Sequence, residues 1–560
     1  MYINDGLYKR NSIILSLPTR HNIVSNSYTS IILAHLSQAL SVQNTTIMDP
    51  FTVTLLLGVV FLLIYYYLWR GMNYFKERGI AHDPVIPIIG HMLPIMMRRI
   101  YMGHYLNDMY NRYSDRKYFG FYNFIRPLIV IRDPDLMNSI TIKNFDYFTD
   151  HHPVVNKDLD PLVAKNLFGL KGDDWREMRK LLSPSFSSAK MKIMFKLIID
   201  CADNFTNHVA IESRNGKIYE LKEILGRYTT DVIATSSFGI AVNSMMDSEN
   251  DFNTFARKTL QISFARGIKM FMGGTFPRLT KLLGLSVFGE QTRLYFKRVI
   301  AETVRQRKEK GIYRPDMIQL MMESRNSKGE ELTIDEMTSQ AFVFFLAGYD
   351  TSSTFMCFVL FAIAANPDVQ AKLRAEIEEV ARKANGQPTY DAIKDMAYMD
   401  AVLNETNRLF PAALFLDRVC VKEFELPPAT PDSKPVLVKP GEAVWFLPLS
   451  FQTDPKYFSD PMKFKPERFL NNEVPQKVYI PFGMGPRICI GNRFALMETK
   501  IMLYYLLLRC EIEPCAKTTL PITLSKKSIM ISVDNGFWLN FKARKNMFPS
   551  QPNGVNVAKA

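Results

Sequence analysis

Three long apolar runs dominate the hydrophobic pattern of the chain. Residues 51–69 form a stretch of nineteen residues without a charged side chain, which is about the length of an α-helix that crosses a bilayer. Residues 333–365 are apolar on both sides of a polar interruption at 347–352, and residues 492–508 contain neither Gly nor Pro. The pattern therefore predicts one lipid-exposed helix near the start of the chain and two long helices in its body.

The run at 333–365 carries helix signals at both ends. Thr333 and Glu336 form a capping-box pattern, and Asn366-Pro367 supplies a stop. The run is long enough for a second membrane span, but Asp350 lies in its middle, and a charge at a bilayer centre costs about 2.5 to 3.5 kcal/mol. We therefore expect a helix through the core of a large domain, where Asp350 and the nearby hydroxyls need hydrogen-bond partners.

Residues 48–69 are predicted to be a membrane anchor. An aromatic cluster at 65–69 fits the membrane interface, and Arg70, Lys76 and Arg78 follow it, whereas the twenty residues before Phe51 contain no Lys or Arg. By the positive-inside rule the C-terminal bulk is cytosolic. A cleaved secretory signal is the alternative, but the run is too long and lacks a small-residue cleavage site.

The remaining boundaries follow from this anchor. Residues 1–47 precede a second methionine, Met48, and are interpreted either as an upstream extension of the coding sequence or as a short lumenal tail. Prolines stiffen a connector at 70–95. Residues 96–545 form one large domain, since the 47% of apolar residues can fill a single core, and 546–560 form a polar tail.

Net charge indicates which classes of partner the protein can bind, and cysteine content indicates the redox state of its compartment. The formal charge of +14 suggests a negatively charged partner: an anionic membrane surface, an acidic protein or nucleic acid. Because the Lys and Arg residues are scattered and no nucleic-acid motif is present, nucleic acid is set aside. The six cysteines include no C-x-x-C pair, so neither a disulfide framework nor a zinc site is expected, and the compartment is reducing.

The candidate chemistry centres on Cys489 in the loop Pro481 to Gly491, P-F-G-M-G-P-R-I-C-I-G. A position just before a helix N-terminus favours the thiolate that binds iron. A lone cysteine is more often a buried free thiol, but F-x-x-G-x-R-x-C-x-G fixes five residue types at set spacings. The pattern indicates a haem-iron ligand, with Arg487 able to reach a propionate and Phe482 able to pack over the ring.

This loop resembles the haem-thiolate loop of the cytochrome P450 superfamily. Four further motifs occur in that family's order: W-x-x-x-R from Trp175, A-G-x-D-T from Ala347, E-x-x-R from Glu405, and P-E-R-F around Arg468. The stretches F-V-F-F-L-A-G-Y-D-T-S-S-T and F-A-L-M-E-T-K are most similar to insect microsomal members of the third clan, particularly its ninth family. The resemblance implies a mostly α fold with a smaller β portion and a single-pass N-terminal anchor.

The resemblance also implies a role for each motif residue. Thr351 would donate a hydrogen bond to the dioxygen being activated, Asp350 would relay protons to it, and Gly348 would let a ligand or water approach. The haem propionates would be held by Trp175, Arg179, Arg418 and Arg487, a buried triad of Glu405, Arg408 and Arg468 would brace the loop, and the substrate pocket would be lined by Phe344, Phe345, Ala347, Ala413, Leu414 and Phe415.

Two of these segments have equally simple alternative interpretations. Trp175 and Arg179 lie one helical turn apart and could be an ordinary surface cation–π pair. Residues 265–288 mix apolar residues, glycines and scattered basic residues, which suits either a membrane-dipping lid or an ordinary surface loop with short helices. A basic face formed by Arg176, Lys180, Lys190 and Lys192 could dock an acidic reductase.

The implied function is a haem-thiolate monooxygenase at the cytosolic face of the endoplasmic reticulum. It would contain haem b, take NADPH electrons from a cytochrome P450 reductase, with cytochrome b5 as a second candidate partner, and insert one oxygen atom of O2 into small apolar substrates such as xenobiotics. An endogenous lipid or hormone hydroxylase, a haem-thiolate isomerase or dehydratase that needs no reductase, and a haem carrier or sensor are the alternatives; the Asp350-Thr351 pair argues against the isomerase.

Overall fold

The computed structural model describes residues 49–545, except for 261–263, 315 and 529–530. The chain divides into two units, Met1–Tyr67 and Leu68–Ala560. The predicted N-terminal extension, 1–47, and the predicted polar tail, 546–560, lie outside the described residues. Their status therefore stays a prediction.

Helix α2 (Pro50–Gly71) covers the predicted anchor run and extends two residues beyond it. Its described apolar side chains are exposed, and Phe51 and Leu57 are 77% and 65% exposed. In the part of the chain that the structure describes, one helix has the length and composition to cross a membrane, Ile334–Ala365, and Pro50–Leu63 is a shorter apolar helix. More than half of the apolar window of Ile334–Ala365 is buried, as expected for a core helix.

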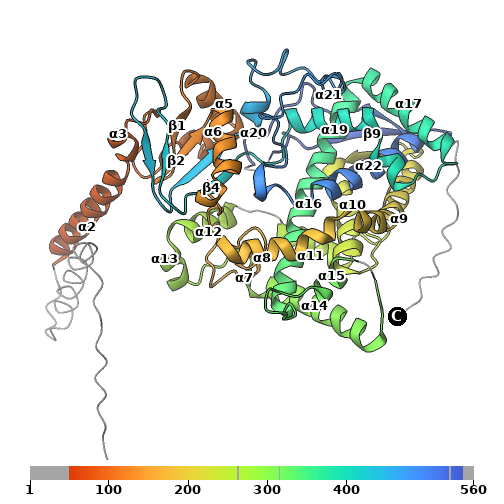
Figure 1. Cartoon of the computed structure of the whole chain (residues 1–560), viewed down its shortest axis with the longest axis horizontal. Helices are drawn as coiled ribbons and strands as arrows, with labels where there is room; N and C mark the ends of the chain where they lie inside the picture. Colours follow the sequence, from red (N-terminus) through yellow and green to blue (C-terminus); the bar gives the residue numbers. More distant parts are fainter. Residues whose placement is uncertain (1–48, 261–263, 315, 529–530, 546–560) are drawn as a thin grey trace, which may run out of the picture. The chain divides into compact units, whose positions relative to one another are not determined.

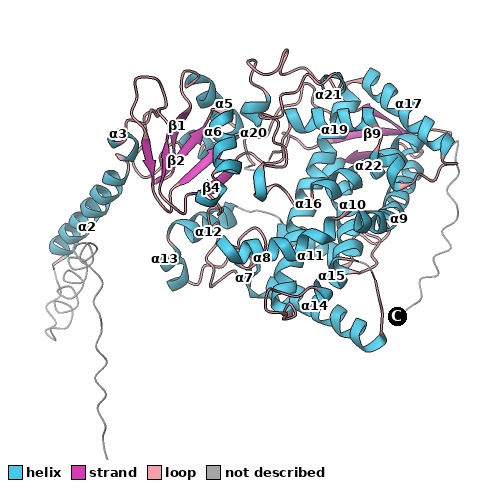
Figure 2. Cartoon of the chain, viewed as in Figure 1, coloured by secondary structure: helices cyan, strands magenta, loops and turns pink. Residues whose placement is uncertain are grey.

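The second unit is mostly helical with a smaller β portion, which confirms that part of the predicted fold class (Figure 2). Its α-helices are α3 (Tyr74–Glu77), α4 (Leu93–Met96), α5 (Met102–Arg112), α6 (Pro134–Asn138), α7 (Pro161–Ala164), α8 (Gly172–Leu182), α9 (Ser188–Ser213), α10 (Leu221–Ile233), α11 (Asp251–Leu260), α12 (Phe264–Thr275), α13 (Pro277–Leu282), α14 (Gly289–Lys310), α15 (Met317–Glu323), α16 (Ile334–Ala365), α17 (Pro367–Lys383), α18 (Tyr390–Lys394), α19 (Ala397–Leu409), α20 (Pro448–Gln452), α21 (Glu467–Leu470) and α22 (Asn492–Arg509). Short 3-10 or π segments are η1 (Ser139–Lys143), η2 (Phe145–Tyr147), η3 (Ser183–Phe186), η4 (Ala234–Phe238) and η5 (Gly485–Arg487).

In the described part of the chain, nine strands form three small sheets. They are β1 (Tyr118–Asn123), β2 (Arg126–Ile131), β3 (Ile218–Glu220), β4 (Leu416–Val419), β5 (Phe424–Leu426), β6 (Val436–Val438), β7 (Ala443–Phe446), β8 (Cys510–Pro514) and β9 (Trp538–Ala543). The largest sheet has the order β1-β2-β7-β4, in which only the β2–β7 pair is parallel. Strands β3-β9-β8 and β5-β6 form the other two sheets.

Helix α16 is the central element of the helical part (Figure 1). Thr333 caps it, with the reciprocal hydrogen bonds to Glu336 that the capping-box pattern predicts, and its thirty-two residues span about 48 Å. It packs against α7, α10, α14 and α19. Residues on both sides of its midpoint are almost wholly buried, so the two halves of α16 belong to two large apolar clusters.

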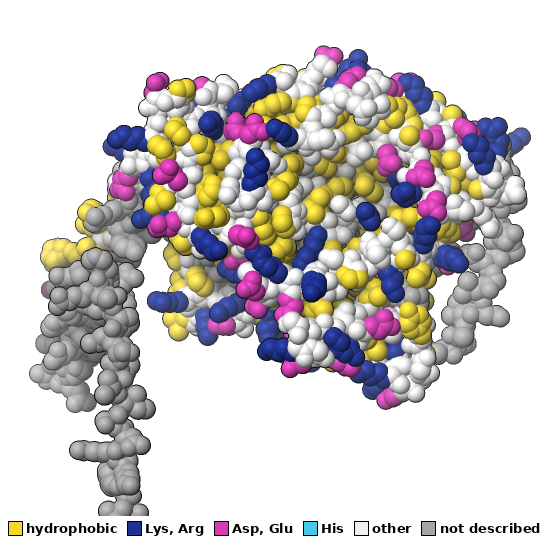
Figure 3. Space-filling model, viewed as in Figure 1, with side chains coloured by type: hydrophobic (Ala, Val, Ile, Leu, Met, Phe, Trp, Pro, Cys, Tyr) yellow, Lys and Arg dark blue, Asp and Glu magenta, His cyan; other side chains and the backbone are white. Residues whose placement is uncertain are grey.

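The described surface mixes charges of both signs. In the view of Figure 3, Lys and Arg side chains are interspersed with Asp and Glu and with apolar patches. This distribution agrees with the sequence, in which 69 basic residues and 55 acidic residues are both scattered along the chain.

A buried carboxyl group on α10 should make the stability of the fold depend on pH. Burial raises the pKa of Asp231 to about 7, although both carboxylate oxygens accept the Ser244 backbone N–H. Above about pH 4 the unfolded chain ionises this group freely, whereas the folded chain resists ionisation until about pH 7. The stability that Asp231 contributes is therefore present at low pH and is lost as the pH rises to about 7.

Replacing Asp231 by Asn removes this titration. One pKa unit corresponds to about 1.4 kcal/mol, and about two units of the shift lie above pH 5, so the free energy of unfolding of the parent protein relative to Asp231→Asn should fall by up to about 3 kcal/mol between about pH 5 and about pH 8. Urea unfolding of both proteins at the two pH values measures this difference. An equal difference at both values would contradict the assignment.

Candidate functional site

The Cys489 loop is held in shape by backbone geometry. Gly483 and Gly485 have φ angles of 82° and 72°, which favour glycine, and a Cβ on Gly485 would collide with the Thr141 carbonyl oxygen. The backbone N–H of Cys489 donates to the Phe482 carbonyl at 2.9 Å. Helix α22 begins directly after the loop, at Asn492. The sequence therefore fixes the direction of the Cys489 side chain through a closed loop and a helix start.

The surroundings of Cys489 indicate a hollow in the protein. Its side chain is exposed, yet burial raises the pKa of its thiol, against the lowering effects of the Gly491 N–H and the Arg179 guanidinium. A side chain that is accessible but closely surrounded by protein lines a concave space rather than the convex surface. The Gly491 N–H belongs to the start of α22, where the helix dipole favours a thiolate.

Two buried arginines near this loop form their hydrogen bonds with backbone carbonyls rather than with carboxylates. Arg418 on β4 is 2% exposed, and among the described residues it donates only to the Asp417 and Met484 carbonyls, while its Nε has no partner there. Arg487 donates to the carbonyls of Thr149, Leu167 and Leu170. Burial lowers the pKa of Arg418 to about 10, and burial and repulsion by Arg418 lower the pKa of Arg487 to about 9.

Trp175 and Arg179 extend the same cluster from α8. Trp175 is buried, and the Arg487 guanidinium lies 4.0 Å from the centre of its ring. The cation over Trp175 is thus Arg487, not the neighbour one turn away that a surface cation–π pair would use. Burial lowers the pKa of Arg179, and attraction by Cys489 partly opposes that shift, so Arg179 is near enough to Cys489 for their charges to interact.

These residues fit a haem. Buried cations are costly unless they are paired, and Arg179, Arg418 and Arg487 have one carboxylate, Asp150 at 3.8 Å from Arg487, within ion-pair distance among the described residues. A flat ligand with two carboxylates would neutralise the cluster, and its iron would accept the Cys489 sulfur. The donor set, the orphaned Arg418 Nε and the hollow are all explained by this group.

One face of α16 supplies the opposite wall. Ala347 is exposed, and Phe344, Gly348 and Thr351 are half-buried, although the helix on either side is buried. Positions 344, 347, 348 and 351 have the spacing of a single helical face. The ring of Phe186 lies between Phe344 and Gly491, because it meets Phe344 edge-on and would touch a Cβ on Gly491. The structure therefore brings the middle of α16 and the cysteine loop to the same region.

Thr351 and Asp350, two polar residues of α16, face different partners. The Thr351 hydroxyl donates to the Ala347 carbonyl at 2.5 Å, within the hollow-facing stripe. The Asp350 carboxylate instead lies 2.8 Å from the ammonium of Lys222 on α10. Consecutive helix residues are about 100° apart, so a proton that passes from Asp350 to Thr351 must cross between two sides of α16.

Lys222 is a partner that sequence reasoning did not find. Its ammonium group also donates to the Asp350 carbonyl and to the hydroxyls of Ser353 and Thr354, so four groups of α16 hold it in place. Both ends of the ion pair are about one third exposed. No local pattern links residue 222 to residue 350, and only the packing of α10 on α16 brings them together.

Gly348 allows close helix packing, and the expected approach of a ligand or water at this glycine stays a prediction. A Cβ on Gly348 would lie 2.9 Å from Ile233 Cδ1, and a Cβ on Gly226 would lie 2.9 Å from the Tyr349 hydroxyl. The two glycines therefore allow α10 and α16 to approach closely. Their positions explain why these helices form the most extensive helix pair in the fold.

Adding a methyl group at Gly348 should therefore destabilise the helix pair. We expect Gly348→Ala to lower the free energy of unfolding by about 1 to 3 kcal/mol through overpacking against Ile233. Chemical unfolding measures the change, and Gly267→Ala, at a helical glycine with nothing within contact distance, is the matched control. If the two variants were equally stable, the packing role would be refuted.

The predicted pocket residues separate into two groups. Phe345 is fully buried, with its ring among those of Phe238, Phe252 and Phe296, so it belongs to the core and not to a pocket wall. The helical period turns it away from the face of Phe344 and Ala347.

The residues that follow α19 also divide. The Phe415 ring stacks on Trp445 of β7 with 3.8 Å between ring centres, which directs it toward the sheet. Ala413 and Leu414 are half-buried. Leu414 also meets the α5 backbone at Gly103. The described geometry therefore leaves Phe344, Ala347, Ala413 and Leu414 as the stronger pocket candidates.

Glu405, Arg408 and Arg468 form a buried ion-pair triad. Arg408 donates to both carboxylate oxygens of Glu405 at 2.7 and 2.9 Å, and Arg468 Nε lies 3.3 Å from the same carboxylate. All three side chains are 2% exposed or less. Arg408 also donates to the Gln452 and Pro461 carbonyls, so the charges are fully hydrogen-bonded, as burial requires.

Gln452 and Tyr479 connect this triad to the cysteine loop. The Gln452 side chain donates to the Arg408 carbonyl and accepts from the backbone N–H of Ile480, the residue before the loop. The Tyr479 hydroxyl donates to the Asn404 side chain at 2.9 Å, next to Glu405. Neither residue belongs to a recognisable motif, so no local pattern predicts this connection.

The predicted docking face and lid are both partly occupied by internal contacts. Arg176 pairs with Asp146 and Lys192 with Asp391, whereas Lys180 and Lys190 have no ion-pair partner among the described residues. The segment 265–288 contains α12 and α13, and the Asn156 amide donates to the Pro277 carbonyl. Leu279, Leu282 and Leu283 remain exposed.

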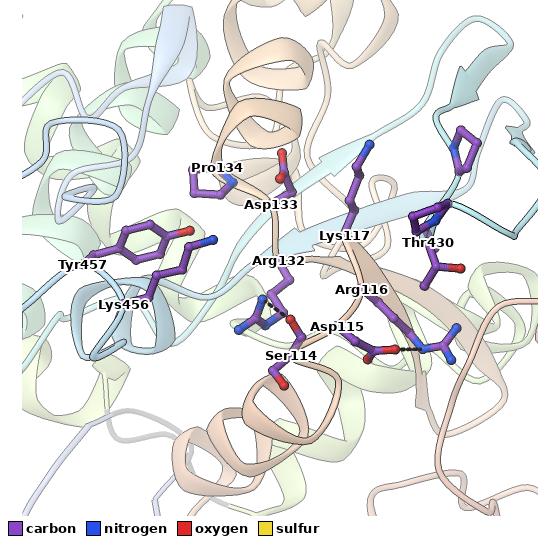
Figure 4. Close-up of a pocket in the computed structure, with 13 residues that line it drawn as sticks. Ser114, Asp115, Arg116, Lys117, Arg132, Asp133, Pro134, Thr430, Lys456 and Tyr457 are labelled. Carbon is purple, nitrogen blue, oxygen red and sulfur yellow. Dashed lines mark hydrogen bonds and ion pairs between the residues drawn. The ribbon is translucent and has the colours of Figure 1, made fainter.

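A separate pocket of about 380 Å³ lies away from these residues (Figure 4). It is lined by polar and charged side chains, among them Lys117, Arg132 and Lys456, and Arg132 donates to the Ser114 carbonyl across it. None of the predicted site residues lines this pocket. Its charged walls do not suit a flat apolar ring.

Comparison with known proteins supports the assignment of a haem site around Cys489. Residues 81–539 match the family model described as Cytochrome P450. Cytochrome P450 9e2 of Blattella germanica is 39% identical over 526 residues, which cover 87% of this chain and 98% of that protein. Probable cytochrome P450 9f2 and cytochrome P450 9b2, both of Drosophila melanogaster, are 36% and 34% identical and cover 86% and 88% of the chain and 97% and 99% of their own lengths.

Proposed function

The chain belongs to the cytochrome P450 family and is most similar to insect members of its ninth family, and from this premise we propose that it is a membrane-anchored monooxygenase. The family implies a haem cofactor and generally monooxygenase activity. The proposed reaction is of the unspecific monooxygenase class: one oxygen atom of O2 enters a small apolar substrate and the other leaves as water.

The observation that carries this proposal is the position of Thr351 on the α16 face that lines the hollow, with the Asp350 carboxylate beside it and one third exposed. Oxygen activation consumes protons, and this pair offers a hydroxyl at the hollow and an acid that solvent can reach. An isomerase needs no such proton supply. A haem carrier needs neither residue.

The haem itself would supply the activation of dioxygen, with a thiolate that favours O–O cleavage. In the proposed site Cys489 binds the iron, and Arg179, Arg418, Arg487 and Trp175 hold the propionates. Phe344, Ala347, Ala413 and Leu414 offer an apolar wall with few fixed polar contacts. Such a wall selects substrates by size and hydrophobicity more than by hydrogen bonds.

Electrons are proposed to come from NADPH through a cytochrome P450 reductase, with cytochrome b5 as a second partner. The unpaired Lys180 and Lys190 support an acidic partner at this face. The exposed apolar side chains of α2 and of α13 support anchoring in the endoplasmic reticulum membrane, with 48–69 as the anchor, 70–95 as the connector and 96–545 as the cytosolic catalytic domain.

Foreign apolar compounds are the proposed substrate class, because the relatives belong to the insect ninth family and the candidate walls lack specific polar contacts. An endogenous lipid or hormone is the second candidate. Screening both classes for a substrate-induced shift of the haem absorption band distinguishes them.

The decisive experiment measures NADPH-dependent oxygen consumption and product formation in membranes that contain this protein and a reductase. We expect both, and a carbon monoxide difference spectrum typical of thiolate ligation. The same membranes without reductase should form no product. Product formation that needs neither NADPH nor reductase would replace the monooxygenase by an isomerase or dehydratase.

A further inference from the structure

A pocket of about 700 Å³ lies beside the chain that leaves helix α2. Its walls come from two segments far apart in the sequence: residues 76–79, at the end of α3, and residues 433–439, which include β6. Tyr118 and Ala429 complete it, and Ala429 also lines the pocket of Figure 4. None of the haem-site residues lines this second pocket, so it needs an explanation of its own.

The lining of this pocket is strongly cationic. It contains Lys76, Arg78, Lys434 and Lys439 against a single carboxylate, Glu77. The ammonium groups of the three lysines have no ion-pair partner among the residues that the structure describes. An excess of unpaired positive charge in a concave site attracts anions, because the walls reduce screening by water.

Arg78 is fixed in the wall of the pocket. Its guanidinium lies 3.3 Å from the Glu442 carboxylate and 3.8 Å from the centre of the Tyr74 ring. Glu442 also accepts from the Tyr74 hydroxyl and from the Lys439 backbone N–H. These contacts tie the α3 wall to the strand wall, so the pocket is held together without a ligand.

The chain path brings this pocket close to the end of the predicted anchor. Helix α2 ends at Gly71, five residues before Lys76, and five residues span at most about 18 Å. Ile88, 39% exposed with a φ angle of 69°, donates its backbone N–H to Met72 Sδ at 3.3 Å. A β-branched residue in the left-handed region is strained, yet its side chain stays exposed beside the residue that follows the helix.

Exposed apolar side chains accompany the lysines. Leu437, on the pocket wall, and Ile86, beside Ile88, are both more than one third exposed. Apolar side chains mixed with unpaired lysines are typical of a surface that meets the boundary between lipid tails and head groups. A docking site for a soluble anion would not need these apolar groups.

We propose that this pocket binds the phosphate of an anionic phospholipid in the membrane that holds the anchor. Lysine ammonium groups bind phosphate as mobile point charges, and each one near an anionic leaflet contributes to attraction. This inference rests on the proposed membrane location. It adds a contact that orients the catalytic domain through residues 434 and 439, which lie more than 350 residues after the anchor.

The test uses the full-length haem protein in vesicles of phosphatidylcholine, with or without about one fifth phosphatidylserine, and measures acetylation of each lysine by mass spectrometry. We expect Lys76, Lys434 and Lys439 to react about fivefold more slowly in the anionic vesicles. Lys526 and Lys527, an exposed pair elsewhere, serve as internal controls and should react equally in both.

A double variant separates a pocket from general attraction to the surface. In Lys434→Gln/Lys439→Gln, Lys76 should lose its protection in anionic vesicles, whereas the matched variant Lys526→Gln/Lys527→Gln should keep it. Persistent protection of Lys76 in the first variant would overturn the pocket. Inorganic phosphate added to phosphatidylcholine vesicles is the third arm, and equal protection there would identify a soluble-anion site and overturn the lipid assignment.

Extraction at alkaline pH separates failure of this inference from failure of the membrane proposal. A protein that stays in the vesicles but whose three lysines react equally in both vesicle types would overturn the pocket alone. A protein that is washed from the vesicles would overturn both.

Discussion

Arg408→Ala should yield a protein that does not retain haem. The Arg408 side chain is fully buried, and its removal leaves the Glu405 carboxylate with one long contact to Arg468, 3.3 Å, and the Lys465 backbone N–H. Breaking one partner out of a buried ion pair costs about 3 to 5 kcal/mol, which is a large part of the stability of a typical domain. We expect little or no signal in the carbon monoxide difference spectrum of the variant.

The loss should reach the haem through named contacts. Arg408 and Gln452 are joined by hydrogen bonds in both directions, and Gln452 accepts from the Ile480 N–H, next to Pro481. Collapse of the triad therefore releases the start of the cysteine loop. Thermal unfolding and haem content together distinguish this effect from a rate defect in a loaded enzyme.

A surface ion pair provides the matched control. Lys372 lies 2.8 Å from Glu467, the residue beside Arg468, and both ends are substantially exposed. Such pairs contribute about 0 to 1 kcal/mol, so Lys372→Ala should keep full haem content. An Arg408→Ala protein with the haem content of the parent would refute the bracing role.

The sequence predicted features that depend on local pattern. Capping and periodicity are encoded within a few residues. For this reason the sequence predicted the caps of α16, the uninterrupted helix α22, and the helix that carries Glu405 and Arg408. The triad was accessible for a different reason: its three residues belong to motifs with fixed order and spacing.

The sequence did not predict which side chains of a helix face the core and which face the hollow. Phe344 and Phe345 are equivalent in the sequence, yet one lines the hollow and the other is fully buried in an aromatic cluster. The missing Cβ of Gly348 accommodates Ile233, a packing role that the motif did not indicate. Both outcomes depend on the contact between α10 and α16, which no single-sequence pattern specifies.

Long-range polar partners were also missed. Lys222 and Asp350 are 128 residues apart, and a lysine at the start of an amphipathic helix normally faces solvent. Its four contacts to α16 arise because α10 crosses that helix at the polar interruption. The sequence correctly predicted that Asp350 needs a hydrogen-bond partner. The identity of that partner, Lys222, could be found only from the packing of α10 on α16.

Thr351→Ala should uncouple electron consumption from product formation. The Thr351 hydroxyl is the polar group of α16 on the stripe that faces the hollow, and it donates to the Ala347 carbonyl at 2.5 Å. Its oxygen therefore presents acceptor lone pairs to the hollow, and rotation would let it donate there. Without it, NADPH oxidation should continue while product formed per NADPH falls at least about tenfold.

Three comparisons separate this role from loss of packing. Thr351→Ser keeps the hydroxyl and should keep most of the coupling. Ser352→Ala removes a buried hydroxyl one residue later and should leave the product per NADPH unchanged. Asp350→Asn should instead slow NADPH oxidation itself, because it removes the solvent-accessible acid while Thr351 is still present.

Because Lys222 holds the Asp350 carboxylate at 2.8 Å, proton transfer toward Thr351 requires that this ion pair open or that protons pass through it. Lys222→Met removes the ammonium group but preserves much of the side-chain volume, so it should change the rate of NADPH oxidation in the presence of substrate more than it changes product per NADPH. Stopped-flow reduction and steady-state product analysis measure the two quantities.

Unchanged coupling in Thr351→Ala would show that protons reach the oxygen by another route, and the roles of both α16 residues would then have to be reassigned.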